Sequence, residues 1–205
     1  MEVINQESKE SEIVEQLEIL GKFNCSRDIV AEVFRNSAEY PNALKTFFSK
    51  YDDLRDSIPI NSLRYFWEIL NESDYEKEKT IFKEKLLPKL IEFLVDKNDS
   101  VRYHTVRFLW KGSDKVADAI KNKPETKKIL ENLVHIFEWN TETIETKEYV
   151  LSTLHEIALE LPKKHEQRNR IAGWFEKMIE QPHFYGITKD GENEIKKYID
   201  EIMKL

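Results

Sequence analysis

The sequence predicts an all-α fold, and three observations support this prediction. Apolar residues recur at helical spacing from Ile13 to Ile202, and no stretch alternates apolar and polar residues as a strand would. Only 5 Gly and 6 Pro interrupt 205 residues, and strong helix formers such as Glu, Lys and Leu are abundant. With 40% hydrophobic residues, the chain can also build a substantial core without disulfides or metals.

Residues 1–8 lack helical periodicity, and we expect them to form a flexible tail ahead of a single helical domain over 9–205. The first helix then ends at Gly21, and Ser26 begins a second as its N-cap. Pro41 opens a third helix, because proline is tolerated in the first turn of a helix. A fourth begins near residue 61.

The next helix carries a proline in its interior. Ser73 and Glu76 have the spacing of a capping box, and the apolar stripe that follows continues to Val95. Pro88 lies within this stripe, where a proline removes a backbone hydrogen bond and costs on the order of 3 kcal/mol unless packing offsets it. We therefore predict a kink, with residues 86–95 packed against a following helix over about 100–111 that ends at Gly112.

The remaining helices are predicted from the same signals. They cover about 114–121, 125–139 with Pro124 at the first position, and 144–161 ended by Pro162. Two more finish the chain, one carrying Ile171, Trp174, Phe175, Met178 and Ile179 and a closing helix carrying Ile195, Tyr198, Ile199 and Ile202. The segment QPHFYG, residues 181–186, is predicted to be the turn before the last helix.

Residues 86–109 resemble a HEAT repeat, a pair of antiparallel helices. The resemblance rests on leucines and a proline in the first helix, an aspartate at the turn, and Val-Arg followed by a small residue and a leucine in the second. The matching residues are Leu86, Leu87, Pro88, Leu90, Glu92, Leu94, Asp96, Val101, Arg102, Thr105 and Leu109. Thr105 stands where the family usually has alanine.

A shift of 43 residues indicates that this unit recurs. It aligns Leu87, Leu90, Ile91, Phe93, Leu94 and Val101 with Leu130, Leu133, Val134, Ile136, Phe137 and Ile144. The reverse shift aligns RFLW, residues 107–110, with RYFW, residues 64–67. The repeats are degenerate, because Glu131 and Trp139 replace Pro88 and Asp96, and residues 144–161 align better at a shift of 45.

The resemblance implies a HEAT- or armadillo-like right-handed superhelix of roughly four or five helix pairs, an α solenoid in which neighbouring pairs share one continuous core. Proteins of this class usually bind partners on the surface lined by their second helices. The resemblance therefore favours a non-enzymatic protein-interaction or scaffold module, with no cofactor.

The distribution of charge indicates where a partner would bind. The net charge is −7, but eight basic and three acidic residues occupy 102–128. We expect a basic ridge made of Arg64, Arg102, Arg107, Lys111 and Lys115. Guanidinium and ammonium groups suit the carboxylates or phosphates of an acidic or phosphorylated protein partner. An ordinary solvated face is the alternative.

Nucleic acid is a less favoured partner. HEAT-like arrays include DNA glycosylases, and Trp67, Trp110, Trp139 and Trp174 invite a base-stacking role. Each tryptophan lies in an apolar stripe, however, which favours packing, and the acidic chain lacks the strongly basic face that duplex binding needs. A DNA-repair module remains the alternative function.

The sequence contains no recognisable catalytic or metal-binding motif. The five histidines show no i,i+4 pairing, and no Gly-x-Ser-x-Gly elbow or glycine-rich phosphate loop occurs. Cys25 is the only cysteine, so it is interpreted as a structural thiol in a reducing compartment, the cytosol or nucleus. No signal peptide or membrane-spanning stretch is expected.

The N-terminal helix is acidic. Glu10, Glu12, Glu15 and Glu18 surround its apolar stripe, which is consistent with recognition of a basic partner or with the polar outer face of a capping helix.

Overall fold

The computed structural model describes residues 2–23, 25–50, 60–122, 127–139 and 141–204, and these ranges contain helices and no strands. The all-α prediction is therefore confirmed. The chain divides into two compact units, Met1–Lys111 and Gly112–Leu205. The single domain expected over 9–205 stays a prediction. The division follows from the packing, because most helices contact helices that are close to them in sequence.

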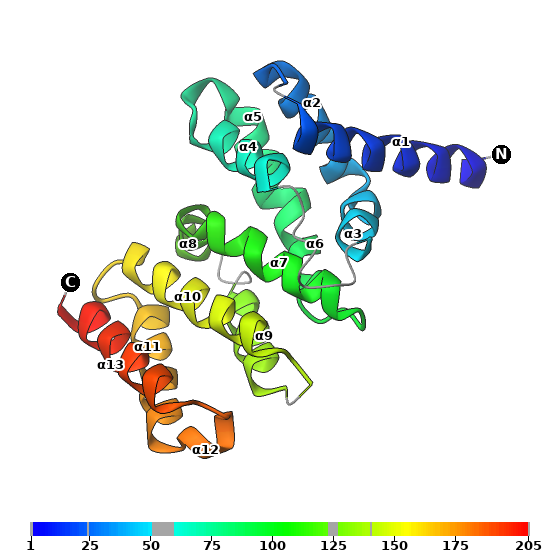
Figure 1. The fold of residues 1–205 in the computed structure, drawn as a ribbon. Coiled ribbons are helices and arrows are strands. Elements are labelled where there is room, and N and C mark those ends of the chain that lie inside the picture. The colour runs from blue at the N-terminus through cyan, green and yellow to red at the C-terminus, as the bar shows by residue number, and fades with distance from the viewer. Residues whose placement is uncertain (1, 24, 51–59, 123–126, 140, 205) are drawn as a thin grey trace. The chain divides into compact units, whose positions relative to one another are not determined.

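The first unit is built from nine helical segments among its described residues (Figure 1). These are α1 (Glu2–Lys22), α2 (Arg27–Glu39), α3 (Pro41–Ser49), α4 (Ile60–Asn71), the 3-10 turn η1 (Ser73–Tyr75), α5 (Glu76–Ile81), the π turn η2 (Phe82–Leu86), α6 (Leu87–Phe93) and α7 (Asp99–Lys111).

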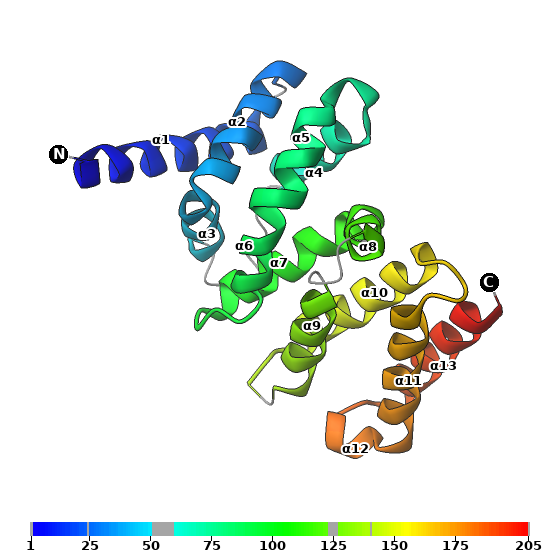
Figure 2. The same ribbon diagram turned by 180° about the vertical axis from the view of Figure 1, so that it is seen from behind.

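Helix α1 begins earlier than the sequence predicts. The expected tail over 1–8 is helical from Glu2, and Figures 1 and 2 both show the N-terminal part of α1 extending past α2 and α3. Side-chain contacts one turn apart, Gln6 to Glu10 at 3.1 Å and Lys9 to Glu12 at 3.1 Å, stabilise this exposed stretch. The core begins only at Ile13, which is buried.

The apolar face of α1 packs on α2, α3 and α4, and α7 packs on α3, α4 and α6. Aromatic side chains join these layers. Phe66 of α4 meets Phe34 of α2 edge to face, with 5.2 Å between ring centroids, and Phe108 of α7 at 6.3 Å. Trp67 lies 4.6 Å from the Phe108 ring. The two motifs that a 43-residue shift aligns, RYFW and RFLW, therefore contact each other through these aromatic residues.

The predicted kink at Pro88 takes the form of a π turn. The Leu87 N–H donates to the Phe82 carbonyl, five residues back, so α5, η2 and α6 follow one another without a break. A proline ring collides with the carbonyl four residues before it and donates no hydrogen bond. The wider turn accommodates both effects one turn ahead of Pro88. Ser73 does not act as a side-chain cap, because the chain there forms η1 with Glu72 as its N-cap.

The second unit is centred on α10. Its described segments are α8 (Ser113–Asn122), α9 (Lys128–Glu138), α10 (Ile144–Glu160), α11 (Glu166–Glu180), α12 (Pro182–Tyr185) and α13 (Lys189–Lys204). Helix α10 packs against α8, α9, α11 and α13, and α11 packs against α13. The prediction for Pro124 falls outside the described residues. The predicted turn over 181–186 contains α12, which ends at Gly186 with φ +66°, a conformation that favours glycine.

A buried arginine joins three helices of this unit. The Arg168 side chain, on α11, is 3% exposed. Its Nη1 donates to the Leu161 carbonyl at 2.9 Å, and its Nη2 and Nε donate to the Ile202 carbonyl at 2.6 and 3.2 Å. Leu161 is the C-cap of α10, and Ile202 lies in the last turn of α13. The guanidinium therefore satisfies carbonyl groups at two helix C-termini, where a positive charge is favourable.

Burial agrees with the repeat alignment in α9 and corrects it in α10. Leu130, Leu133 and Phe137 are buried, like Leu87, Leu90 and Leu94. Val101 is also buried, but Ile144, its partner at a shift of 43, is 75% exposed. At a shift of 45, Val101 and Thr105 correspond instead to Thr146 and Val150, which are both buried. The longer shift therefore describes the second helix of this pair.

Candidate interaction surface

Arg102 is the predicted binding residue that the structure buries. Its side chain is 5% exposed, and its Nη1 donates to the main-chain carbonyl of Asp96 at 2.7 Å. The Asp96 carboxylate accepts from the Asn98 N–H at 3.0 Å and lies 2.5 Å from Lys45 Nζ. Arg102 therefore stabilises the loop between α6 and α7, and it does not belong to an accessible ridge.

The electrostatics of Asp96 match this structural role. Burial alone raises the pKa of the Asp96 carboxyl, but the hydrogen bonds from Lys45 and Asn98 and the charges of Lys45 and Lys97 outweigh it. The net effect holds the Asp96 pKa below its ordinary value. Asp96 and Arg102 are both among the residues that resemble a HEAT repeat. In the structure, both form hydrogen bonds within the loop between α6 and α7.

Two predicted residues lie on the accessible part of α7, and each rests on an aromatic ring. The Arg107 guanidinium lies 5.4 Å from the centroid of the Tyr103 ring, and Lys111 Nζ lies 3.8 Å from that of Trp110. Lys111 is exposed and Arg107 is half-buried. A ring beneath a cation attracts it and restricts its rotamers. These contacts hold both positive charges near the C-terminal end of α7.

Arg64 is exposed on α4, the helix that packs on α7 through Trp67 and Phe66. Its side chain is 69% exposed, and its Nε donates to Glu68 Oε1 at 2.6 Å, one turn along the helix. An exposed pair of this kind contributes little stability, so Arg64 can exchange this carboxylate for another.

Lys115 belongs to the other unit. Its Nζ lies 3.0 Å from Asp114 Oδ2 in the first turn of α8. Of the five residues predicted to form the ridge, Arg64, Arg107 and Lys111 thus remain as accessible cations of the first unit. We call these three residues the basic set.

The tryptophans divide into one buried and three half-buried side chains. Trp67 is 5% exposed in the core of the first unit. Each of the others has a cation or an imidazole beside its ring. Lys111 lies over Trp110, Arg170 over Trp174 at 4.9 Å, and His135 beside Trp139 at 4.8 Å. Their surroundings are those of packing residues at the edge of a core.

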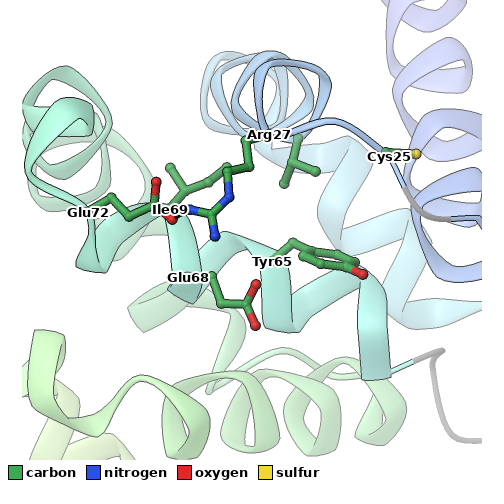
Figure 3. Close-up of a pocket in the computed structure, with 7 residues that line it drawn as sticks. Cys25, Arg27, Tyr65, Glu68, Ile69 and Glu72 are labelled. Atoms are coloured by element: carbon green, nitrogen blue, oxygen red, sulfur yellow. Dashed lines mark ion pairs between the residues drawn. The ribbon is translucent and has the colours of Figure 1, made fainter.

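A small pocket that the sequence did not predict lies between α2 and α4 (Figure 3). Its volume is about 130 Å³, and its lining residues are Cys25, Arg27, Val30, Tyr65, Glu68, Ile69 and Glu72. Arg27 pairs with Glu72 across the pocket, and Glu68 belongs to the pair with Arg64. The i,i+4 spacing of Glu68 and Glu72 is visible in the sequence, but the pairing of Glu72 with Arg27 depends on the packing of α2 against α4.

A second group of titratable side chains lies in the other unit, between α10 and α13. His155 is 6% exposed, its Nε2 lies 2.9 Å from Glu201 Oε2, and its ring stacks on Tyr198 with centroids 4.0 Å apart. Burial lowers the pKa of His155, although the charges of Glu156 and Glu201 partly oppose this effect. Burial, followed by the hydrogen bond to Glu194, raises the pKa of Tyr198 to about 12. These groups attach the last helix to the centre of its unit.

Neither group has the composition of a metal centre. Among the residues that the structure describes, no three His, Cys, Asp or Glu side chains are placed to hold a metal ion. The described helices likewise include none that is long and apolar enough to cross a membrane. Cys25 is half-buried at the edge of the pocket.

Comparison with known proteins adds no further assignment. No protein-family model matches the chain, and neither a curated protein nor a solved structure matches it significantly.

Proposed function

We propose that the chain is a non-enzymatic interaction module, and that its first unit binds an acidic or phosphorylated segment of a partner protein through the basic set. The main support is the pair of cations on α7 that rest on aromatic rings, Arg107 on Tyr103 and Lys111 on Trp110. A side chain that is already held in position loses little conformational entropy when it binds. Because the backbone of the binding surface is helical, it also loses little conformational entropy on binding.

The chemistry of the basic set fits carboxylate and phosphate groups. A guanidinium offers a planar fork of donors, and an ammonium offers three rotatable donors, so the set can contact several oxygens of one acidic segment. We also propose, with the HEAT-like resemblance, that the helix pairs stack as a superhelix, with α7 and α10 as second helices. Helix α7 is largely buried, so the binding surface would be restricted to its C-terminal end and the adjacent face of α4.

The experiment is a selection from a displayed library of random peptides, followed by fluorescence anisotropy with the enriched sequences. We expect the wild-type chain to enrich peptides rich in Asp, Glu or phosphoserine. The double variant Arg107→Glu/Lys111→Glu should bind them at least tenfold more weakly, since charge-assisted hydrogen bonds are worth roughly 1.5–3 kcal/mol each. Arg64→Glu alone should have a smaller effect, because Glu68 competes for Arg64.

A matched control is Lys85→Glu/Lys89→Glu, which changes the net charge equally at one exposed and one half-buried lysine of the same unit. If the control weakens binding as much as the α7 variant, the binding is a response to net charge and the proposed site is wrong. Enrichment of peptides without acidic residues would also contradict it. Salt distinguishes the nucleic-acid alternative, because duplex binding that falls steeply with salt and exceeds peptide binding would favour that function.

A further inference from the structure

The turn between α1 and α2 exposes apolar side chains at an unusual density. Ile19 lies in the last turn of α1 and is 49% exposed, and Phe23, the residue after α1, is 64% exposed. Ile29 in the first turn of α2 is 49% exposed. Seven large hydrophobic side chains are strongly exposed among the described residues, and these three lie within eleven consecutive positions. We call them the apolar turn. Exposed apolar residues that gather in one place are typical of an interaction site.

Exposed acidic residues flank the side chains of the apolar turn in the sequence. Glu12 and Glu15 are exposed on α1 ahead of Ile19, and Asp28 and Glu32 are exposed on either side of Ile29. Residues 12–32 contain five acidic and two basic residues, a balance of −3. One of those two bases, Arg27, is paired with Glu72 at the pocket in Figure 3. Two of the acids are also paired, Glu12 with Lys9 and Glu18 with Lys50. The segment therefore combines exposed apolar side chains with exposed carboxylates, and we call Glu12, Glu15, Asp28 and Glu32 its acidic rim.

We propose that the apolar turn and its acidic rim are a docking site for a basic amphipathic helix of a partner protein. The apolar face of such a helix would cover Ile19, Phe23 and Ile29, and its lysines or arginines would lie against the four exposed carboxylates. In recognition of an amphipathic helix, apolar anchors supply affinity and charges select the partner. The site is separate from the basic set and does not depend on the function proposed for it.

The charges also decide between the possible occupants. A second copy of the chain would bring the same negative rim against this one, and like charges across an interface are unfavourable. An anionic membrane surface would be repelled for the same reason. The polar outer face of a terminal capping helix would account for the carboxylates, but it would not account for the exposed side chains of Ile19 and Phe23.

The test uses two labelled 18-residue peptides with the same helical pattern, one of Leu and Lys and the other of Leu and Glu. Fluorescence anisotropy at near-physiological salt should show that the full chain binds the Leu/Lys peptide and not the Leu/Glu peptide. Ile19→Ser/Phe23→Ser should weaken binding at least tenfold, and Asp28→Lys/Glu32→Lys should do the same. All four positions are exposed, so circular dichroism should show unchanged helix content.

Matched controls come from the second unit. Ile144→Ser/Phe184→Ser removes two side chains that are 75% and 72% exposed, and Glu145→Lys/Glu148→Lys reverses two exposed carboxylates beside Ile144. Both controls, and Arg107→Glu/Lys111→Glu, should leave binding of the Leu/Lys peptide unchanged. The proposal is overturned if the wild type does not bind this peptide, if the controls weaken binding equally, or if the Leu/Glu peptide binds as well. A dimer in sedimentation that Phe23→Ser dissociates would assign the turn to a second copy instead.

Discussion

Replacing Arg168 by methionine should destabilise the second unit by about 3 kcal/mol, and the estimate follows from the contacts of its guanidinium. Two carbonyl acceptors, at Leu161 and Ile202, lose charge-assisted bonds worth roughly 1.5–3 kcal/mol each. Methionine fills much of the same space and removes the cost of burying a charge. This offsets on the order of 1–3 kcal/mol of the lost stability. The loss of stability should be largest at α13, because two of the three hydrogen bonds of Arg168 are accepted by the Ile202 carbonyl.

Hydrogen exchange read by mass spectrometry measures this prediction helix by helix, which matters because the chain has two units. Amides of α13 should exchange about a hundredfold faster in Arg168→Met, since each 1.4 kcal/mol is a factor of ten in an equilibrium constant. The control is Arg170→Met on the same helix. Arg170 is 38% exposed and contacts Glu131 at 3.2 Å and the Trp174 ring, so its loss should cost at most about 1 kcal/mol. If Arg168→Met is no more damaging than Arg170→Met, the three-helix junction does not hold α13 in place.

Two further predictions concern a helix cap and a titrating histidine. Thr143→Ala should destabilise α10 by about 1 kcal/mol in urea denaturation, because Thr143 Oγ1 accepts from the Thr146 N–H at 3.2 Å. Ser26→Ala should cost much less, because the Ser26 side chain makes no cap hydrogen bond at α2, and equal costs would contradict the argument. Burial holds the pKa of His155 below the unfolded value of 6.5, so the unfolded chain binds the extra proton first. The free energy of unfolding of the second unit should therefore decrease as the pH falls from about 6.5 through the lower folded pKa. His155→Phe, which keeps a ring against Tyr198, should flatten this dependence, and an unchanged pH profile would show that His155 is not its source.

Local signals in the sequence located the helices. Pro41, Gly112 and Pro162 mark ends that lie within one or two residues of those observed, because each changes what the backbone itself can do. The sequence also predicts the part of α1 that carries apolar residues, but it does not predict the first turns of this helix. Those turns contain few apolar residues and are stabilised by contacts between polar side chains one turn apart. The periodicity of apolar residues therefore does not predict them.

The candidate site was harder to predict, because accessibility depends on tertiary packing. Arg102 and Arg107 are five residues apart on α7, yet one is buried against the Asp96 carbonyl and the other lies partly exposed over Tyr103. The spacing of basic residues along the chain does not distinguish the two. The pocket beside Cys25 was missed for a related reason, since Arg27 and Glu72 are brought together only by the packing of α2 on α4. The stacking of the pairs into a superhelix stays a prediction.

The π turn before Pro88 amounts to one extra residue in a continuous helix, and this changes which way the helix faces. One residue corresponds to a rotation of about 100° around a helix axis. The turn η2, with buried Phe82 and Leu86, can therefore pack on α2, while α6, with buried Leu90 and Phe93, packs on α7. Loss of a single residue between 83 and 85 would remove this extra residue, and one of the two sets of apolar side chains would then point away from its neighbour.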